Sequence, residues 1–182
     1  MKKVILIGFM GAGKTTIGRL LAEETKQSHV DFDDLIVAEI GMTIQEFFDQ
    51  HGEAAFRKIE TDILAKTLAK EQIISTGGGI VLKEENRQLL KEMPLVVYLK
   101  TDPEELIHRL KADTGSIRPL VVSKTPEEIL AVYRPRIPLY EETASLIVET
   151  TNKVPQEIVQ EILRSEERRV GKECRSRWSP YH

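Results

Sequence analysis

Apolar residues follow two alternating patterns along most of this chain. Short unbroken runs of aliphatic and β-branched residues, such as Val4–Ile7, are typical of strands buried on both faces. Between these runs, apolar residues recur three or four positions apart, as Ile17, Leu20 and Leu21 do, which indicates helices. The strands predicted in this way span 4–7, 29–32, 73–76, 95–99 and 145–148. Strands alternating with helices predict an α/β fold, a three-layer sandwich around a central parallel sheet of about five strands.

Residues with known capping preferences mark the ends of the predicted helices. Gly41 is a natural helix terminator, and Thr43 with Glu46 forms a capping box. Pro103 and Pro126 each occupy a first helical position. The predicted helices span 14–25, 35–40, a short helix from 43, then 53–69, 83–91, a helix from 102, 125–143 and 155–163. Because no repeat or linker interrupts this order, residues 1–163 are expected to form one domain.

The last nineteen residues, 164–182, break the pattern. They show no helical or strand period, and they hold the only cysteine and the only tryptophan, Cys174 and Trp178. Their sequence resembles the in-frame translation of a short-read sequencing adapter. We therefore predict a non-native tail and exclude it from the fold. The alternative is a natural basic tail that binds nucleic acid.

Composition and charge narrow the classes of function. The chain has a formal net charge of −3, and it is more acidic still without its basic tail, so nucleic-acid binding is not expected. No run of 18 apolar residues exists, which excludes a membrane-spanning helix from the prediction. Near-absence of cysteine favours the cytoplasm. A monomer is expected, since no additional apolar face is evident.

The segment from Gly8 to Thr15, GFMGAGKT, matches the phosphate-binding pattern GxxxxGK[ST]. It lies between a predicted buried strand and a helix, where backbone N–H groups and the helix N-terminus can bind phosphate oxygens. Lys14 would reach the β- and γ-phosphates, and the Thr15 hydroxyl would bind Mg²⁺. The pattern predicts binding of ATP and transfer of its terminal phosphoryl group. The predicted nucleotide contacts are Gly11, Ala12, Gly13, Lys14, Thr15 and Thr16.

Two carboxylates, Asp31 and Asp33, close the second predicted strand. Because side chains alternate along a strand, both would point the same way, at the edge of the sheet where ligands bind. One could hold a magnesium-bound water while the other accepts the proton of an acceptor hydroxyl. The alternative is a solvated loop or a helix cap, with Asp34 the better cap.

Further candidates follow along the chain. Arg57 could bind a carboxylate and be held by Glu60, or the two could form only a surface ion pair. The triplet 77–79 allows close approach to a ligand, or is simply a flexible turn. Arg118, in an irregular stretch, and Arg136, beside a proline, are each either surface residues or phosphate and substrate ligands.

Taken in order, these segments resemble the shikimate kinases, a family of P-loop kinases. The matching pieces are GFMGAGKT, the Asp31-x-Asp33 pair, FRxxE from Phe56 to Glu60, the glycine triplet, Arg118-Pro-Leu and Arg136-x-Pro-Leu-Tyr140. The resemblance implies ATP-dependent phosphorylation of the 3-hydroxyl of shikimate, in the pathway to chorismate and the aromatic amino acids. A gluconate kinase or a regulatory nucleotide-binding domain is the alternative.

The resemblance also implies a role for individual residues. Asp33 would orient or deprotonate the hydroxyl, and Lys14 and Arg118 would neutralise the transferring phosphoryl group. The shikimate carboxylate would be held by Arg57, Arg136 and the Gly79 backbone. Thr15 would bind Mg²⁺ directly and Asp31 through water. Adenine would be contacted by Arg109 or Lys111 on one face and by Pro155 on the other. Residues 34–60 would bind the acceptor, and 112–124 would form a mobile lid.

Overall fold

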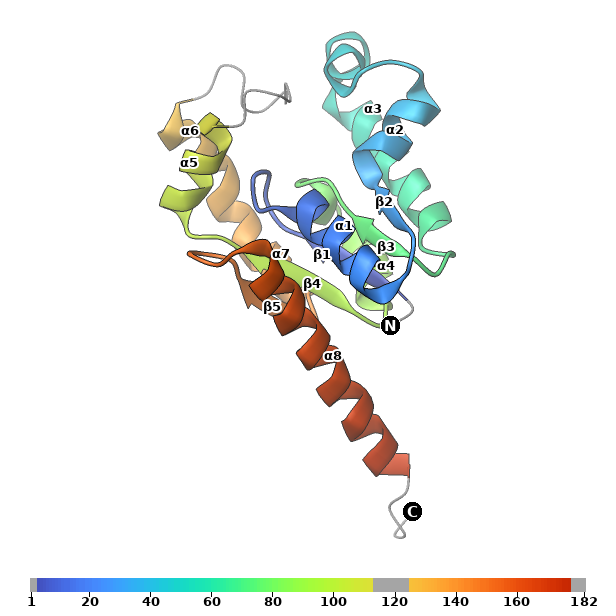
Figure 1. Cartoon of the computed structure of the whole chain (residues 1–182). Coiled ribbons are helices and arrows are strands. Elements are labelled where there is room, and N and C mark those ends of the chain that lie inside the picture. Colours follow the sequence, from blue (N-terminus) through green and yellow to red (C-terminus); the bar gives the residue numbers. More distant parts are fainter. Residues whose placement is uncertain (1–2, 113–124, 178–182) are drawn as a thin grey trace.

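A computed structural model of the chain describes residues 3–112 and 125–177 (Figure 1). In chain order its elements are β1 (Val4–Ile7), α1 (Lys14–Thr25), β2 (His29–Asp31), α2 (Phe32–Ile40), α3 (Ile44–Thr67), β3 (Ile73–Ser75), the 3₁₀ turn η1 (Ile80–Leu82), α4 (Glu84–Lys91), β4 (Val96–Lys100), α5 (Pro103–Ala112), α6 (Pro126–Tyr133), the 3₁₀ turn η2 (Arg134–Arg136), α7 (Ile137–Thr143), β5 (Leu146–Glu149) and α8 (Pro155–Arg177).

The five strands form one sheet in the order β2-β3-β1-β4-β5, and every pair is parallel. The central strand β1 is buried along its whole length, with Val4 and Leu6 in one apolar cluster and Ile5 and Ile7 in the other. The first cluster is covered by α1 and α8, and the second by helices that include α3, α4 and α7. The predicted three-layer α/β sandwich is therefore confirmed, and the carboxyl ends of all five strands meet at one edge, where ligands bind in such sheets.

Two groups of helices rise beyond that edge. Figure 1 shows α2 and the first part of α3 on one side of the segment that joins β1 to α1, with α5 and α6 on the other. The capping box is present, because Glu46 N donates to Thr43 Oγ1 at 3.1 Å and Thr43 N donates to Glu46 Oε2 at 3.4 Å. The helices predicted from 43 and from 53 are joined in α3, interrupted at Gly52 by a non-helical backbone (φ 81°).

The stretch predicted as one bent helix over 125–143 is divided at its prolines into α6, η2 and α7. The backbone keeps right-handed helical angles at Arg136 and Ile137, and the Arg136 side chain is buried. The predicted lid over 112–124 lies outside the described residues apart from Ala112, and Arg118 lies outside them as well.

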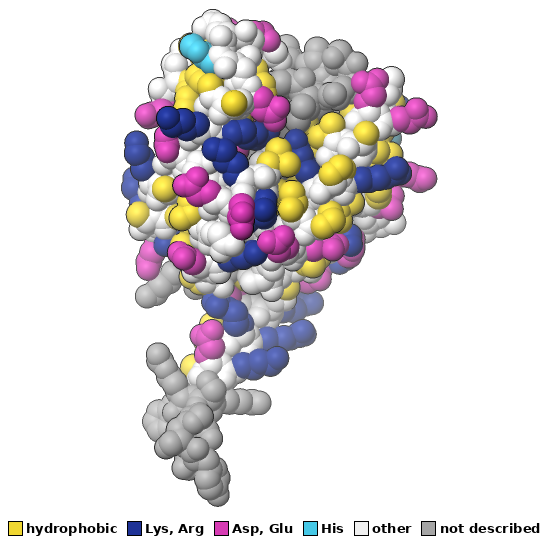
Figure 2. Space-filling model, turned by 180° about the vertical axis from the view of Figure 1, so that it is seen from behind, with side chains coloured by type: hydrophobic (Ala, Val, Ile, Leu, Met, Phe, Trp, Pro, Cys, Tyr) yellow, Lys and Arg dark blue, Asp and Glu magenta, His cyan; other side chains and the backbone are white. Residues whose placement is uncertain are grey.

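The last helix corrects the sequence prediction. We expected it to end near Leu163, but α8 continues to Arg177. Its projecting half has no apolar period but carries ion pairs at helical spacing. Arg169 pairs with Glu166 at 3.0 Å and with Glu173 at 3.6 Å. Arg169 also donates to the carbonyl of Pro94 at 3.1 Å. Seen from behind, Lys and Arg side chains crowd this projecting part (Figure 2).

Among the described helices, none is both long enough and apolar enough to cross a membrane.

Candidate active site

The turn from β1 into α1 forms a phosphate loop. Gly11 and Gly13 have φ angles of 81° and 93°, which are left-handed values that L-residues with side chains rarely adopt. A side chain on Gly8 would place its Cβ 2.9 Å from the carbonyl oxygen of Leu99. The glycines are therefore required both for the curvature of the loop and for its close packing on β4.

Lys14 begins α1 and folds back into this loop. Its side chain is 8% exposed, and Nζ donates to the carbonyl oxygens of Gly8 at 2.5 Å and Phe9 at 3.0 Å. These backbone partners hold the ammonium at the concave side of the loop. A bound triphosphate would replace these carbonyl contacts of the ammonium with stronger contacts to phosphate oxygens, in which both partners are charged.

Thr15 and the two aspartates form a linked group. The Thr15 hydroxyl donates to Asp31 Oδ2 at 2.6 Å, and Asp31 Oδ1 accepts from the backbone N–H of Asp33 at 3.0 Å. Asp31 is thus the N-cap of α2, where Asp34 was predicted to be the better cap. The strand ends at Asp31, so the prediction that both aspartates lie on a strand is wrong. Asp33 lies in the first turn of a helix instead.

Both aspartates nevertheless reach the same cleft, because α2 starts directly at the carboxyl end of β2. The cleft is lined by Gly11, Gly13, Lys14, Thr15, Thr16, Asp31, Asp33, Thr76, Gly77, Gly78 and Arg109. It joins the phosphate loop to the glycine triplet. Donor and acceptor groups can therefore meet within one space.

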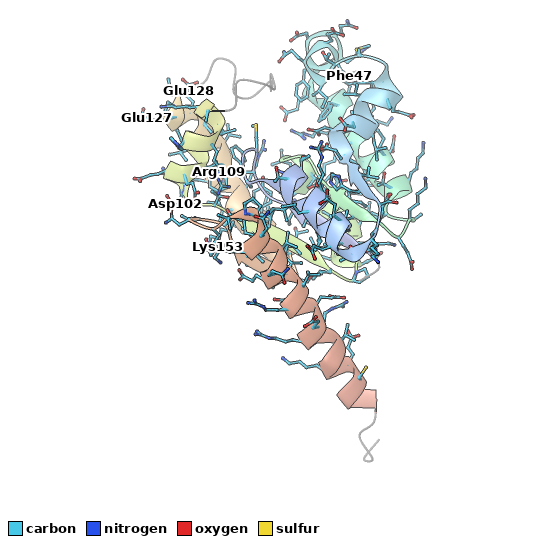
Figure 3. The ribbon with its side chains drawn as sticks, in the orientation of Figure 1. Phe47, Asp102, Arg109, Glu127, Glu128 and Lys153 are labelled. Atoms are coloured by element: carbon cyan, nitrogen blue, oxygen red, sulfur yellow. The ribbon has the colours of Figure 1, made fainter. Side chains whose placement is uncertain are left out.

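Arg109 is the better placed of the two predicted adenine contacts. Figure 3 shows it on α5, and its Nη1 lies 3.3 Å from Gly11 O and 3.4 Å from Ala12 O. Lys111 is exposed, and neither it nor Pro155 is among the described residues that line the cleft. A contact of Pro155 with adenine stays a prediction.

Arg57 and Glu60 form a buried pair, not a surface ion pair. Their side chains are 12% and 1% exposed, and Arg57 Nη1 lies 3.0 Å from Glu60 Oε1. Burial raises the pKa of Glu60, and the Arg57 cation opposes this shift. A Cβ on Gly79 would lie 2.3 Å from Arg57 Nη1, so the guanidinium packs directly against the third glycine of the triplet.

Arg136 approaches the same triplet from η2. It is 5% exposed, and its Nη1 would lie 3.7 Å from a Cβ placed on Gly78. The Tyr140 hydroxyl donates to the carbonyl of Gly78, and the Tyr140 ring stacks on Tyr98 at 5.0 Å. Burial raises the pKa of Tyr140 and the neighbouring Arg136 opposes this only in part, so the phenol stays protonated as a donor.

These two arginines share one unusual feature. Within residues 3–112 and 125–177, Arg57 Nε and Arg136 Nη1 are buried and have no hydrogen-bond partner. Leaving a buried donor unsatisfied costs about 1–3 kcal/mol, more for a charged group. Arg87 Nε on α4 is in the same state, so what distinguishes Arg57 and Arg136 is that both guanidinium groups also pack against the glycine triplet.

Sequence reasoning missed three features of this site. Thr76 lines the cleft, and no motif singled it out. The Phe9 ring lies beneath the Arg136 guanidinium, with Arg136 Cζ 5.6 Å from the ring centroid. The burial of Glu60 was also unexpected, although its position one helical turn from Arg57 is the signal that could have indicated it.

A parallel sheet whose first strand enters a glycine loop and a lysine-bearing helix defines a P-loop nucleotide-binding fold. The Asp31 and Asp33 carboxylates line the cleft beside the loop, whereas Arg57 and Arg136 pack against the glycine triplet and are not among the described residues that line this cleft.

Comparison with known proteins narrows this class. The family model described as shikimate kinase matches residues 10–167. A shikimate kinase of Enterococcus faecalis is 46% identical over 163 residues, covering 90% of this chain and 97% of that protein. A solved shikimate kinase from Acinetobacter baumannii, in complex with shikimate, superposes with a TM-score of 0.86 at 34% identity, covering 93% of this chain and 94% of that one. The chain belongs to the shikimate kinase family.

A gluconokinase from Sinorhizobium meliloti also superposes, with a TM-score of 0.62, covering 98% of each chain. Its identity to this chain is 17%, so the likeness extends to the fold alone.

Proposed function

We propose that this chain transfers the terminal phosphoryl group of ATP to the 3-hydroxyl of shikimate, giving shikimate 3-phosphate and ADP. Family membership supports the reaction, and the relative from Acinetobacter baumannii binds shikimate. The product would feed the pathway to chorismate and the aromatic amino acids.

The pair of unpartnered guanidinium donors carries this proposal. Shikimate is a small polyol with one carboxylate, and that carboxylate has the two oxygens needed to accept from Arg57 Nε and Arg136 Nη1. The Gly79 backbone would complete the contact, since Gly79 packs against Arg57. The planar fork of arginine suits a carboxylate better than a lysine does.

Asp33 would act at the other end of the acceptor. A Cβ placed on Gly77 would lie 3.2 Å from Asp33 Oδ1, which puts this carboxylate beside the triplet as well. We propose that it accepts the proton of the 3-hydroxyl as that oxygen attacks the γ-phosphorus of ATP. Asp33→Asn should lower turnover by about 10²–10⁴-fold with ATP affinity retained. Unchanged turnover would remove Asp33 from the mechanism.

The residues of the phosphate loop would bind the nucleotide and its metal. Gly11 to Thr16 would donate to the phosphates through the backbone, and Lys14 would neutralise the transferring group, with Arg118 as a second cation. The Thr15 hydroxyl and the Asp31 carboxylate, 2.6 Å apart, form an oxygen donor set of the kind that Mg²⁺ takes together with water. Bound there, Mg²⁺ would neutralise phosphate charge.

The decisive test compares acceptors. ADP release should be observed with shikimate and not with gluconate, and turnover with gluconate alone would favour the alternative kinase. A chain that binds ATP and releases no ADP with either acceptor would indicate a regulatory domain. A version ending near Leu163 should behave as the whole chain does, if the tail is non-native.

Arg136→Ala tests the carboxylate clamp. Its loss should cost about 2–5 kcal/mol of acceptor binding, a rise in the apparent KM for shikimate of roughly 30-fold or more. Arg134→Ala is the matched control, because Arg134 is exposed in the same turn. An unchanged KM in Arg136→Ala would show that the clamp is wrongly placed.

Other inferences from the sequence remain proposals. They are the monomeric state, the cytoplasmic location, the lid and the non-native origin of residues 164–182.

A further inference from the structure

Phe9, the second residue of the phosphate loop, contacts both halves of the site. Its side chain is 1% exposed. Its ring lies under the Arg136 guanidinium, with 5.6 Å from Cζ to the ring centroid, and against Tyr133, with 4.9 Å between ring centroids. Its backbone carbonyl accepts from Lys14 Nζ at 3.0 Å. One residue thus serves the donor lysine through its main chain and an acceptor arginine through its side chain.

The two clamp arginines are oriented in different ways. Arg57 also lies over a ring, with Cζ 5.2 Å from the Phe56 centroid, but it is held by the Glu60 carboxylate at 3.0 Å as well. Among the described residues, no carboxylate lies within ion-pairing distance of Arg136; the Phe9 ring and the neutral phenol of Tyr140 are next to it, and the Glu60 carboxylate acts on it from farther away. The ring is in turn fixed by Tyr133, which is itself buried.

This difference has a chemical consequence. A carboxylate occupies the N–H edge of a guanidinium, whereas an aromatic ring attracts the cation through its face. An arginine oriented by a ring keeps its N–H edge available, and Arg136 Nη1 is indeed buried without a hydrogen-bond partner in the described part of the chain. A ring is therefore the better support for an arginine that must bind a substrate carboxylate.

We infer that Phe9 is a positioning residue for the acceptor, whose ring holds Arg136 in the orientation that receives the substrate carboxylate. The inference rests on the proposed function, because it takes Arg136 as part of the clamp. It predicts that the side chain of Phe9 affects acceptor binding and leaves nucleotide binding nearly unchanged, since the carbonyl that holds Lys14 belongs to the backbone.

Phe9→Leu keeps apolar bulk and removes the ring. Cation–π interactions contribute about 0.5–2 kcal/mol, so the apparent KM for shikimate should rise by roughly 3- to 30-fold. The KM for ATP should stay within about twofold. Ile162→Val is the control, a buried residue of α8 in the apolar cluster on the opposite face of the sheet from Phe9. This variant should lose stability comparably, as thermal melting would show, with both KM values unchanged.

A double-mutant cycle separates a specific effect from a general one. If the ring acts through Arg136, Phe9→Leu should raise the KM for shikimate in the wild-type background and leave it unchanged in the Arg136→Ala background. An equal rise in both backgrounds, or an equal rise of both KM values, would overturn the inference. Should Phe9→Leu fail to fold, Phe9→Met provides the same comparison.

The cycle also distinguishes the two proposals. If Arg136→Ala raises the KM while Phe9→Leu does not, the clamp stands and the role of Phe9 is wrong. If Arg136→Ala itself has no effect, the clamp is wrong, and the proposed acceptor site fails first.

Discussion

The donor and acceptor halves of the cleft are built in opposite ways. The donor half is one continuous segment from Gly8 to Thr16, and its shape comes from backbone angles and a helix N-terminus. The acceptor half is assembled from α2, α3, the glycine triplet and η2, which are far apart in the sequence. Its shape comes from buried side chains that pack against one another.

The cations of the two halves differ accordingly. Lys14 has backbone carbonyl partners in the loop. Arg57 and Arg136 each have a buried donor left unsatisfied in the described residues. We infer that the donor half has its cation satisfied by the backbone, whereas the proposed acceptor half is organised in advance for an anion at some cost in stability. Preorganisation of this kind strengthens binding because little has to be ordered when the ligand arrives.

The largest effect is expected from a substitution in the donor half alone. Lys14→Met should lower kcat on the order of 10²–10³-fold, by analogy with the removal of one charge-stabilising donor from an active site. Because the acceptor half is built separately, shikimate binding measured by titration calorimetry should change little. Lys58→Met, at an exposed position on α3, is the control and should leave kcat unchanged. Loss of shikimate binding in Lys14→Met would show that the halves are not independent.

A smaller effect should come from steric pressure on the acceptor half. Gly79→Ala would place its Cβ 2.3 Å from Arg57 Nη1 and force the guanidinium away from its pairing with Glu60. Overpacking costs about 1–3 kcal/mol, so a rise of roughly tenfold in the KM for shikimate is expected.

Gly78→Ala is the neighbouring comparison, because its nearest contact would be Met10 N at 3.4 Å, an ordinary van der Waals distance. Its effect on the same KM should be clearly smaller. Equal effects of the two variants would mean that the packing of Arg57 on Gly79 is not what matters.

The smallest expected effect concerns the support of the donor half. Ser75 Oγ donates to the carbonyl of Lys14 at 2.7 Å, so His29 Nε2, 2.8 Å from Ser75 Oγ, must carry the proton and donate. Burial lowers the pKa of His29 below the usual histidine value of about 6.5. The unfolded chain therefore takes up a proton more readily than the folded one as the pH falls below about 6.5.

Stability contributed in this way is present above that pH and is lost as the pH falls through the lowered pKa. The melting temperature should consequently fall as the pH is lowered from about 7.5 to 5.5. His29→Gln should flatten this slope, and His51→Gln, exposed on α3, should not. Identical slopes in the wild type and His29→Gln would exclude His29 as the cause.

The contrast between the halves also explains what the sequence could predict. The phosphate loop is local, so its motif and flanking elements predicted its residues and its fold. The positions of the five strands and the bounds of α1 follow from the hydrophobic pattern in the same way, whereas the order of the strands in the sheet does not. Asp31 and Asp33 were assigned to the cleft for the wrong reason, because a strand that ends one residue earlier, at Asp31, places Asp33 on a helix.

The acceptor half resisted prediction because its contacts are between distant segments. The spacing of Glu60 from Arg57 is the only sign in the sequence that Glu60 is buried, and nothing in the order of residues says that the Phe9 ring lies under Arg136. Only the resemblance to a family brought Arg57, Gly79 and Arg136 together. Likewise, α8 continues where the sequence has no apolar period, and ion pairs such as Arg169 with Glu166 lie along this part of the helix.

The carbonyl contacts of Lys14 have a consequence for selectivity among anions. Inorganic phosphate would have to displace Gly8 and Phe9 from the ammonium and would gain one set of contacts in return. A triphosphate makes the same exchange but also spans the loop amides and the Thr15 hydroxyl. We therefore expect the loop to bind inorganic phosphate weakly and to discriminate among phosphate ligands by the length of the polyphosphate chain.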